Sequence, residues 1–581
     1  MEKMINLKIN GFDISVPEGT TILEAARTNK IKIPTLCYLK DINEIGACRM
    51  CLVEIKGARA LQASCVYPVE EGIEVYTNSE LVRNTRKTNL ELILSDHNRE
   101  CTSCVRSENC ELQSLSKELG ISETPFSGDQ SGCITEINHA IVRDESKCIF
   151  CKRCISVCSN IQGIGALAAD GRGFTAKARP VFGRSLNEVN CIQCGQCIIN
   201  CPVGALKERS TTDEVYSYID DKAKHTIAVI APAVRAAIGE EFGYEIGTDT
   251  TGKMVAAARR LGFDKVFDID FAADVTILEE GTELIGRVTG GGVLPMITSC
   301  SPGWINYCEM FYPEQLANLS TCKSPQGMMG ALLKTHYAKT NNLNPEDVRV
   351  VSIMPCVAKK TEYIREQLSN NGMKDIDTVI TTRELAVMVK GAGIEYTKLE
   401  DEDFDEFYGD GSGAAVIFGA TGGVMEAALR TAVEVITGKV SEKIDYPETR
   451  GTAGIKEFSL AAGDLELKAC VVSGGANIKK VMEMVKAGTA DYHFIEIMAC
   501  PGGCVNGGGQ PIVCAGTKSE IDIKSLRASV LYNRDSSVEK VRKSHENASV
   551  NRLYEEFLGE PNGHLSHELL HTFYEVKPQF K

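Results

Sequence analysis

The chain's most reactive side chains are its 24 cysteines, most of which recur at short, fixed spacings. The densest arrangement is the stretch 496–511, where Cys500 and Cys504 stand four residues apart among five glycines and two prolines. At helical spacing, residues i and i+4 share one face, so both sulfurs would reach one metal centre. Glycine also lets the backbone approach a bulky ligand closely. We therefore predict a metal site here; the alternative is a flexible turn with two buried thiols.

Two further cysteine runs, 148–158 and 191–202, have the spacing of bacterial two-cluster ferredoxins. Each run reads Cys-x2-Cys-x2-Cys-x3-Cys, and in that pattern the fourth cysteine ligates the cluster of the other run. The first run departs slightly, because Ser159 stands where proline is common. One four-iron cluster is therefore expected on Cys148, Cys151, Cys154 and Cys201, and a second on Cys191, Cys194, Cys197 and Cys158.

Two sets of ligand-type residues precede these runs. Residues 37–65 hold four cysteines spaced Cys-x10-Cys-x2-Cys-x13-Cys, which suits a two-iron cluster. Residues 97–110 combine one histidine with three cysteines, spaced His-x3-Cys-x2-Cys-x5-Cys. Zinc also accepts four thiolates, or three with one imidazole, so spacing alone leaves zinc open for both sets. Their members are Cys37, Cys48, Cys51 and Cys65, and His97, Cys101, Cys104 and Cys110.

The C-terminal half carries cysteines in two more loops, Thr298–Trp304 and Met354–Glu362. Short apolar runs alternate there with helical patterns, which predicts an α/β domain with parallel strands buried on both faces. In such folds ligands bind in loops that follow the strands. The apolar runs lie at 226–231, 348–353, 414–418 and 467–472.

The N-terminal part predicts different local structure. Residues 3–16 indicate two strands around a hairpin turn at Asn10-Gly11, and Thr20–Ala26 indicates a capped helix. The composition of residues 114–140 is typical of a linker.

Composition limits the class of protein. A chain of 581 residues exceeds a single core, so several domains are expected. The net charge of −15 argues against binding to nucleic acid. No apolar run is long enough to suggest a membrane span, and the start of the chain does not read as a signal peptide. Clustered cysteines in such a chain indicate metal ligands and a reducing cytoplasm.

The three C-terminal cysteine loops resemble the signatures of FeFe-hydrogenases, which read T-S-C-C-P-x-W, M-P-C-x-x-K-x-x-E and E-x-M-A-C-x-x-G-C-x-x-G-G-G-x-P. The last two match at every fixed position, and the resemblance covers almost the whole chain. Residues 37–65 are also similar to the first domain of the large iron–sulfur subunit of respiratory complex I. The resemblance implies reversible interconversion of H2 with protons and electrons.

The cofactors are likewise implied by the resemblance. They are one [2Fe-2S] cluster, three accessory [4Fe-4S] clusters, one of them bound by His97, and an H-cluster. The H-cluster is a four-iron cubane joined through Cys504 to a two-iron unit that bears CO, cyanide and an azadithiolate bridge. Maturation enzymes must supply those small ligands.

Site residues carry over by position. The cubane ligands would include Cys356, Cys500 and Cys504, and Lys359 would hydrogen-bond a cyanide as a cation near an anionic ligand. The cavity of the two-iron unit would be lined by Ala231, Pro232, Pro325, Gln326 and Met354. The proton path would use Glu280, Glu283, Ser320 and Arg287. Glu280 and Glu283 share a helical face, although without the resemblance such a pair is more often solvated.

One position departs from the family. Where the family has two adjacent cysteines, this chain has Cys300-Ser301. In strict alignment the first relays a proton and the second ligates the cubane, which would place Ser301 at the iron. Because iron–sulfur clusters prefer thiolate, we predict instead that Cys300 is the ligand and that Ser301 handles the proton.

The expected fold class is multidomain, α+β and α/β. The domains are a [2Fe-2S] β-grasp-like domain over 1–80, a His-ligated cluster domain over 81–125, a two-cluster ferredoxin domain over 138–210 and an H-cluster domain over 222–581. Four accessory clusters would relay electrons to ferredoxin or to NAD- and flavin-binding partner subunits, in a reversible reaction. Two other functions are alternatives. An electron-transfer subunit would need only residues 1–209, and a sensory hydrogenase would usually carry a sensor domain.

Overall fold

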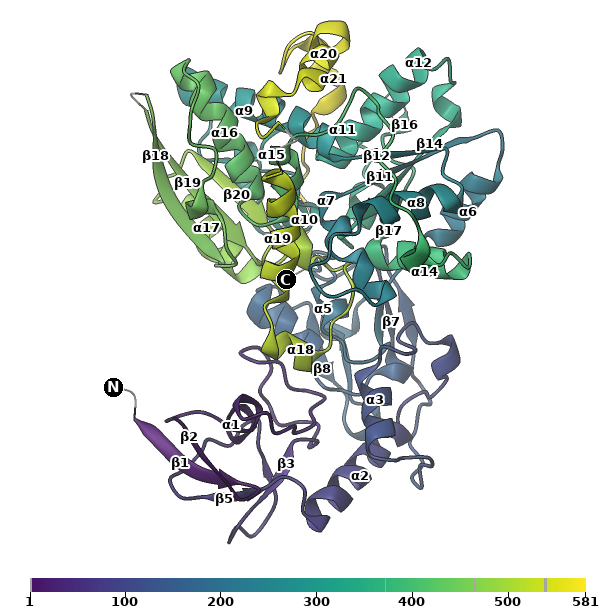
Figure 1. Cartoon of the computed structure of the whole chain (residues 1–581), viewed down its shortest axis with the longest axis vertical. Coiled ribbons are helices and arrows are strands. Elements are labelled where there is room, and N and C mark those ends of the chain that lie inside the picture. Colours follow the sequence, from purple (N-terminus) through teal and green to yellow (C-terminus); the bar gives the residue numbers. More distant parts are fainter. Residues whose placement is uncertain (1–2, 371, 464, 538–540, 581) are drawn as a thin grey trace.

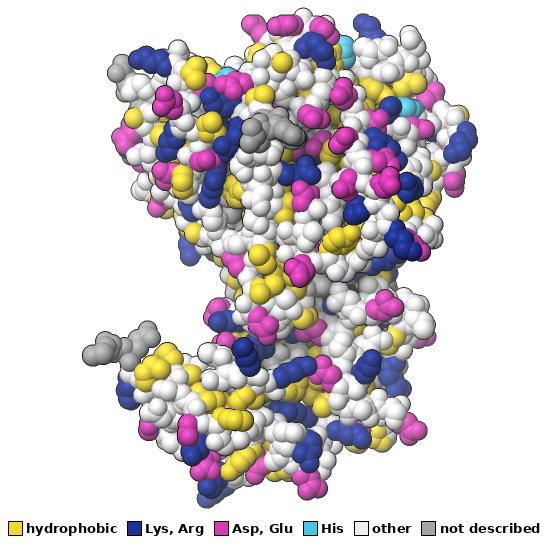
Figure 2. Space-filling model, viewed as in Figure 1, with side chains coloured by type: hydrophobic (Ala, Val, Ile, Leu, Met, Phe, Trp, Pro, Cys, Tyr) yellow, Lys and Arg dark blue, Asp and Glu magenta, His cyan; other side chains and the backbone are white. Residues whose placement is uncertain are grey.

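The computed structural model describes residues 3–370, 372–463, 465–537 and 541–580; residues 1 and 2 of the expected first domain lie outside this range. The chain forms a multidomain α/β structure. Figure 1 shows the small N-terminal units at one end of the long axis and the large C-terminal unit at the other, with the ferredoxin-like segment between them. Figure 2 shows acidic and basic side chains interspersed over both ends of the visible face.

The first unit is a five-stranded sheet of order β2-β1-β5-β3-β4. Its expected hairpin is present, since β1 (Met4–Ile9) and β2 (Phe12–Pro17) are joined by Asn10 and Gly11, both at positive φ. The expected helix is α1 (Ile22–Thr28), which is capped by the Thr21 hydroxyl. The other strands are β3 (Leu52–Ile55), β4 (Gln62–Ala63) and β5 (Glu74–Tyr76).

The next segment contains more regular structure than its sequence indicated. Helix α2 (Glu80–Ser95) leads to the His97 loop, and α3 (Glu111–Glu118) follows Cys110. Helix α3 and strand β6 (Thr135–Ile137) both enter the stretch 114–140, so the linker prediction was wrong at both ends. Helix α3 forms because Leu112 and Leu115 become buried on one face, a tertiary contact that composition does not reveal.

The ferredoxin-like unit is built on two short helices that pack together, α4 (Arg153–Ser156) and α5 (Gln196–Ile199). Each follows a residue in the left-handed region, Lys152 and Gly195 respectively. A sheet of order β10-β7-β6 and the hairpin β8-β9 accompany them. The strands not yet given are β7 (Ile141–Asp144), β8 (Leu167–Asp170), β9 (Lys177–Pro180) and β10 (Leu206–Glu208).

The large unit contains two four-stranded sheets. The first, of order β12-β11-β14-β17, is parallel throughout. The second, of order β13-β20-β19-β18, is parallel except for its β18–β19 hairpin. Their bounds are β11 (His225–Ile230), β12 (Lys265–Asp268), β13 (Met296–Ile297), β14 (Val348–Met354), β17 (Thr378–Thr381), β18 (Ile455–Ala462), β19 (Leu465–Ser473) and β20 (Phe494–Met498).

Three of the four apolar runs are strands, but the strand prediction for 414–418 was wrong. That run forms the buried helix α15 (Gly413–Val416) and the helical turn after it. A short apolar run does not by itself distinguish a buried strand from a buried helix. The alanines at 414 and 415 favour the helix.

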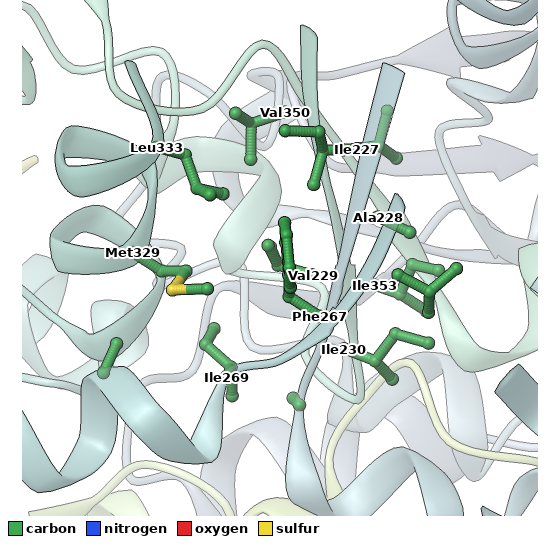
Figure 3. Packing of buried hydrophobic residues seen from close by; sticks show 14 of the residues in the cluster. Ile227, Ala228, Val229, Ile230, Phe267, Ile269, Met329, Leu333, Val350 and Ile353 are labelled. Atoms are coloured by element: carbon green, nitrogen blue, oxygen red, sulfur yellow. The ribbon is translucent and has the colours of Figure 1, made fainter. Parts of the chain in front are cut away.

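Helices pack against the first sheet, and side chains from the sheet and the helices together form a hydrophobic core. Figure 3 shows Val229 of β11 and Val350 of β14 packed near Met329 and Leu333, which lie in and just after α11 (Pro325–Leu332). The helices that matter for the site are α7 (Pro232–Arg235), α9 (Asp270–Gly290), α10 (Pro302–Phe311), α13 (Lys359–Glu362), α16 (Gly423–Thr437), α18 (Ala515–Glu520), α19 (Ile523–Asp535), α20 (Ala548–Leu553) and α21 (His564–Leu570). None of the helices within the described ranges is both long and apolar enough to cross a bilayer.

Candidate functional site

A cavity of about 850 Å³ lies inside the large unit. Its walls include Cys300, Cys356, Cys500 and Cys504, which come from three separate loops. The structure brings eight further residues that the sequence singled out to the same walls: Cys194, Ala231, Pro232, Ser301, Pro325, Gln326, Met354 and Lys359.

The strands explain why these distant residues meet. Ala231 directly follows β11, Cys356 follows β14 by two residues, and Cys500 follows β20 by two residues. Because β11 and β14 run parallel, their carboxyl ends lie at one edge of the sheet, where α/β folds bind ligands. The cavity therefore draws on both sheets.

The loop with Cys500 and Cys504 is not the helix that its spacing suggested. Gly502 and Gly503 have φ values of 85° and 91°, which turn the backbone before Cys504 begins a short helical turn. A Cβ on Gly503 would lie 2.6 Å from the Thr421 nitrogen. Glycine is needed here for both conformation and close approach, and the turn still directs both cysteines to the cavity.

The donor set fits an iron–sulfur cluster. Burial raises the pKa of the thiols of Cys356, Cys500 and Cys504, so the protein alone would keep them neutral. A bound metal centre reverses that preference, because it binds and stabilises thiolates. Several buried thiols beside one cation, in an otherwise largely apolar wall, match the soft-ligand chemistry of iron–sulfur centres.

Lys359 is the cation of this cavity and is held in place on three sides. Its Nζ lies 2.5 Å from a carboxylate oxygen of Glu362, 2.8 Å from Ser324 Oγ and 3.3 Å from the Cys300 carbonyl oxygen. Glu362 also accepts a hydrogen bond from Gln326 at 2.9 Å. Sequence reasoning gave Glu362 no role, although it is a fixed position of the quoted loop pattern.

Cys300 and Ser301 have different surroundings. Ser301 Oγ accepts a hydrogen bond from the Ala499 nitrogen at 3.3 Å, directly before Cys500. Burial and then the Glu280 carboxylate raise the pKa of the Cys300 thiol. Both side chains line the cavity, and the Ser301 contact is the one made beside a predicted cubane ligand.

The four residues expected on the proton path lie together. Ser320 Oγ donates to Glu283 at 2.9 Å, and Arg287 pairs with Glu283 at 2.6 Å. Burial, followed by the nearby Glu283 carboxylate, raises the pKa of Glu280 to about 8. Glu280 is only 4% exposed, so these two carboxyl groups are not the solvated pair that their spacing alone suggested.

The ferredoxin-like cysteines gather in two smaller cavities of about 470 and 400 Å³. The grouping exchanges the fourth cysteine between the runs, as the two-cluster pattern predicts. Cys194 lines the second of these and also the large cavity. The first cavity is lined by Cys148, Cys151, Cys154 and Cys201, and the second by Cys158, Cys191, Cys194 and Cys197.

The two N-terminal ligand sets also fit metal centres. The Sγ atoms of Cys51 and Cys65 lie 3.3 Å apart, and a hydrogen bond from the Cys37 thiol lowers the pKa of Cys48. Burial lowers the pKa of His97 to about 4, which keeps its imidazole neutral, the form that binds metals. Its buried Nδ1 has no hydrogen-bond partner among the described residues.

Family profiles match five segments of the chain. Residues 224–508 match the C-terminal domain of the iron only hydrogenase large subunit, and 521–577 match the iron hydrogenase small subunit. Residues 2–80 match a 2Fe-2S iron-sulfur cluster binding domain, 86–125 the iron-sulfur binding region of NADH-ubiquinone oxidoreductase-G, and 147–205 a 4Fe-4S dicluster domain.

Individual proteins are also similar to this chain, two of them over nearly its whole length. The NADP-reducing hydrogenase subunit HndD of Solidesulfovibrio fructosivorans is 47% identical, covering 98% of this chain and 99% of its own. Iron hydrogenase 1 of Clostridium pasteurianum is 43% identical, covering 98% and 100%. A solved structure of a variant of apo [FeFe]-hydrogenase HydA1 from Chlamydomonas reinhardtii is 40% identical, with a TM-score of 0.57, and covers 64% of this chain and all of that one.

Proposed function

The chain belongs to the iron-only hydrogenase family, and we propose that its large cavity holds an H-cluster on Cys356, Cys500 and Cys504 with Ser301 at the fourth ligand position. Its activity is the interconversion of H2 with protons and electrons. The observation that supports the site best is the convergence of these loops and Lys359 on one buried cavity.

The side chains around the cavity have separable tasks. When bound, an H-cluster supplies the open iron coordination site and the bridging amine at which protons and electrons combine. Lys359 offers a fixed cation toward the cavity, because Glu362 and Ser324 restrain its ammonium group. Ala231, Pro232 and Met354 exclude water from the walls, which strengthens electrostatic interactions inside.

Protons would move along a short series of titratable groups. The Cys300 thiol lies in the cavity wall, and Glu280 and Glu283 lead away from it on α9. With its pKa raised to about 8 by burial, Glu280 holds a proton at neutral pH and is able to give it up in a nearby step. Ser320 bridges toward Glu283 as both donor and acceptor.

Electrons would travel through four accessory clusters. We propose a [2Fe-2S] cluster on the cysteines of residues 37–65, a His97-ligated [4Fe-4S] cluster, and two [4Fe-4S] clusters in the ferredoxin-like unit. Cys194 supports the last step, since it borders both its own cavity and the large one. Gly508 supports the same contact, because a Cβ there would lie 2.3 Å from the Cys194 carbonyl oxygen.

The electron partner is proposed to be ferredoxin or an NAD- and flavin-binding subunit. The full-length similarity to a subunit of an NADP-reducing hydrogenase supports a multi-subunit enzyme. We place it in a reducing cytoplasm, since all 24 cysteines are free in the described chain. Native purification followed by identification of the co-eluting proteins tests the partner.

The function itself is tested with anaerobically matured protein and a reduced viologen dye as the electron donor. We expect H2 evolution and, with oxidised dye, H2 uptake. Iron-replete protein that does neither would contradict the proposed site.

A further inference from the structure

A buried histidine near the end of the chain lies beside the proton path. The backbone of 570–572 runs along 321–323: Lys323 N donates to Leu570 O at 2.8 Å, and Thr572 N donates to Thr321 O at 2.7 Å. This pairing inserts His571, whose side chain is only 3% exposed, next to Glu283. The sequence gave no sign of this contact, since 288 residues separate the two positions.

Both ring nitrogens of His571 have partners. Nδ1 lies 2.7 Å from Thr321 Oγ1, and Nε2 lies 3.2 Å from a carboxylate oxygen of the buried Glu279. A ring nitrogen of His571 lies within 4.8 Å of a Glu283 carboxylate oxygen, a gap that one water molecule can bridge. Thr321 tightens the link, because its backbone nitrogen donates to Glu283 at 3.0 Å.

Arg287, the other neighbour of Glu283, is poorly suited to carry protons. A guanidinium stays protonated at any physiological pH, so Arg287 does not exchange protons with the Glu283 carboxyl group that it pairs with. Imidazole, in contrast, changes protonation state in the physiological range and exchanges a proton at either nitrogen. A histidine beside Glu283 therefore supplies what Arg287 cannot.

His571 is also connected to the surface. Its ring stacks on that of His567, one helical turn earlier in α21, at 4.4 Å between centroids and 11° between planes. His567 is exposed. From solvent inward, the order of titratable side chains is therefore His567, His571 and Glu283.

We propose that His571 is a proton-transfer residue that links Glu283 to solvent at His567, in addition to the partly exposed edge of Glu283 itself. The proposal rests on the hydrogenase function above. In the step, an N–H bond of the His571 imidazolium breaks and an O–H bond forms on Glu283 through the bridging water. The ring then regains a proton from solvent at the His567 surface, and the reverse order serves H2 oxidation.

Other side chains near the His571 ring hold it and its partners in place. Glu279 of α9 is itself held by Tyr554, whose hydroxyl donates at 2.5 Å, and by the Asn562 nitrogen at 2.6 Å. Cys322 Sγ lies within 4.8 Å of the ring nitrogen. The charged and titratable groups around His571 are therefore Glu279, Glu283 and His567, with Arg287 behind Glu283.

The test replaces His571 with Ala and with Gln in the iron-replete, full-length enzyme. The matched control is His564→Ala, at the exposed start of the same helix. We expect His571→Ala to lower H2 turnover by about tenfold, less than the 10²–10⁴-fold expected for a sole relay, because the partly exposed Glu283 still has its own edge toward solvent. Added imidazole should restore part of the loss and change the pH profile, while His564→Ala stays at the wild-type rate.

A second variant covers the case in which His571→Ala does not fold. His567→Ala touches only the surface ring and should give a smaller loss, again rescued by imidazole. Turnover within twofold of wild type in His571→Ala across pH 6–8 would overturn the proposal. A loss that imidazole does not restore, accompanied by a lower melting temperature, would assign His571 a structural role and overturn it equally. An inactive wild-type enzyme would instead contradict the hydrogenase function.

Discussion

Replacing Cys300 and Ser301 one at a time separates the two roles that the cavity offers them. Ser301 Oγ accepts from the Ala499 nitrogen at 3.3 Å, beside the cubane ligands. Burial and then the Glu280 carboxylate, which lies on the proposed proton path, raise the pKa of the Cys300 thiol. Cys300→Ala should therefore remove a proton carrier and leave the ligand position intact, whereas Ser301→Ala should remove an oxygen ligand.

The sizes of the two effects differ. Loss of a proton relay slows turnover by about 10²–10⁴-fold, or roughly 2.7–5.5 kcal/mol in the barrier at 1.36 kcal/mol per tenfold. Ser301→Ala leaves the Ala499 N–H without its acceptor, which lowers the free energy of unfolding by about 1–3 kcal/mol. Ser301→Cys supplies a softer thiolate, so it should hold iron at least as well as the wild type.

The assay combines iron counting, the infrared bands of the CO and cyanide ligands, and H2 evolution on each variant. We expect Cys300→Ala to keep its iron and bands while losing rate, and Ser301→Ala to lose iron from the cubane. If Cys300→Ala loses the bands and Ser301→Ala keeps them, then Cys300 is the ligand, and the Ala499 hydrogen bond does not mark the ligand position.

Two further predictions concern the accessory clusters that relay electrons and the proton path. His97→Ala should slow dye-coupled H2 evolution but not hydrogen–deuterium exchange, because exchange needs only the active site; an equal fall in both, on one preparation, would show that His97 does more than serve the relay. Burial raises the pKa of Glu280 to about 8, well above its ordinary value near 4.5, so the stability that this group contributes is fully present below about pH 4.5 and is lost as pH rises through about 8. Glu280→Gln should therefore gain melting temperature relative to wild type between pH 5.5 and pH 8.5, and a difference that is constant with pH would show that the pKa of Glu280 is not raised.

The ligand sets were predictable because their signal is local. The spacing of 148–158 and 191–201 is sufficient to predict the exchange of the fourth cysteine, and the structure groups the eight side chains accordingly. The parallel strands β11 and β14 were predictable for a similar reason, since strands buried on both faces read as continuous apolar runs.

Other features depend on contacts that the sequence does not display. The run 414–418 is apolar in a helix or in a strand, and only its packing decides between them. The roles of Cys300 and Ser301 depend on which way two adjacent side chains turn, and a hydrogen bond from the loop at 499 influences this. His571 reaches Glu283 only because the end of the chain pairs with 321–323.

Cys504→Ala tests whether the large cavity holds an H-cluster, because Cys504 is proposed to join the cubane to the two-iron unit. In anaerobically matured protein, we expect this variant to evolve no H2 and to lack the CO and cyanide infrared bands, while its accessory clusters remain reducible. The wild type, prepared in parallel, should show both activity and bands. Wild-type rates of H2 evolution in Cys504→Ala, with iron content confirmed, would contradict the assignment of the cavity.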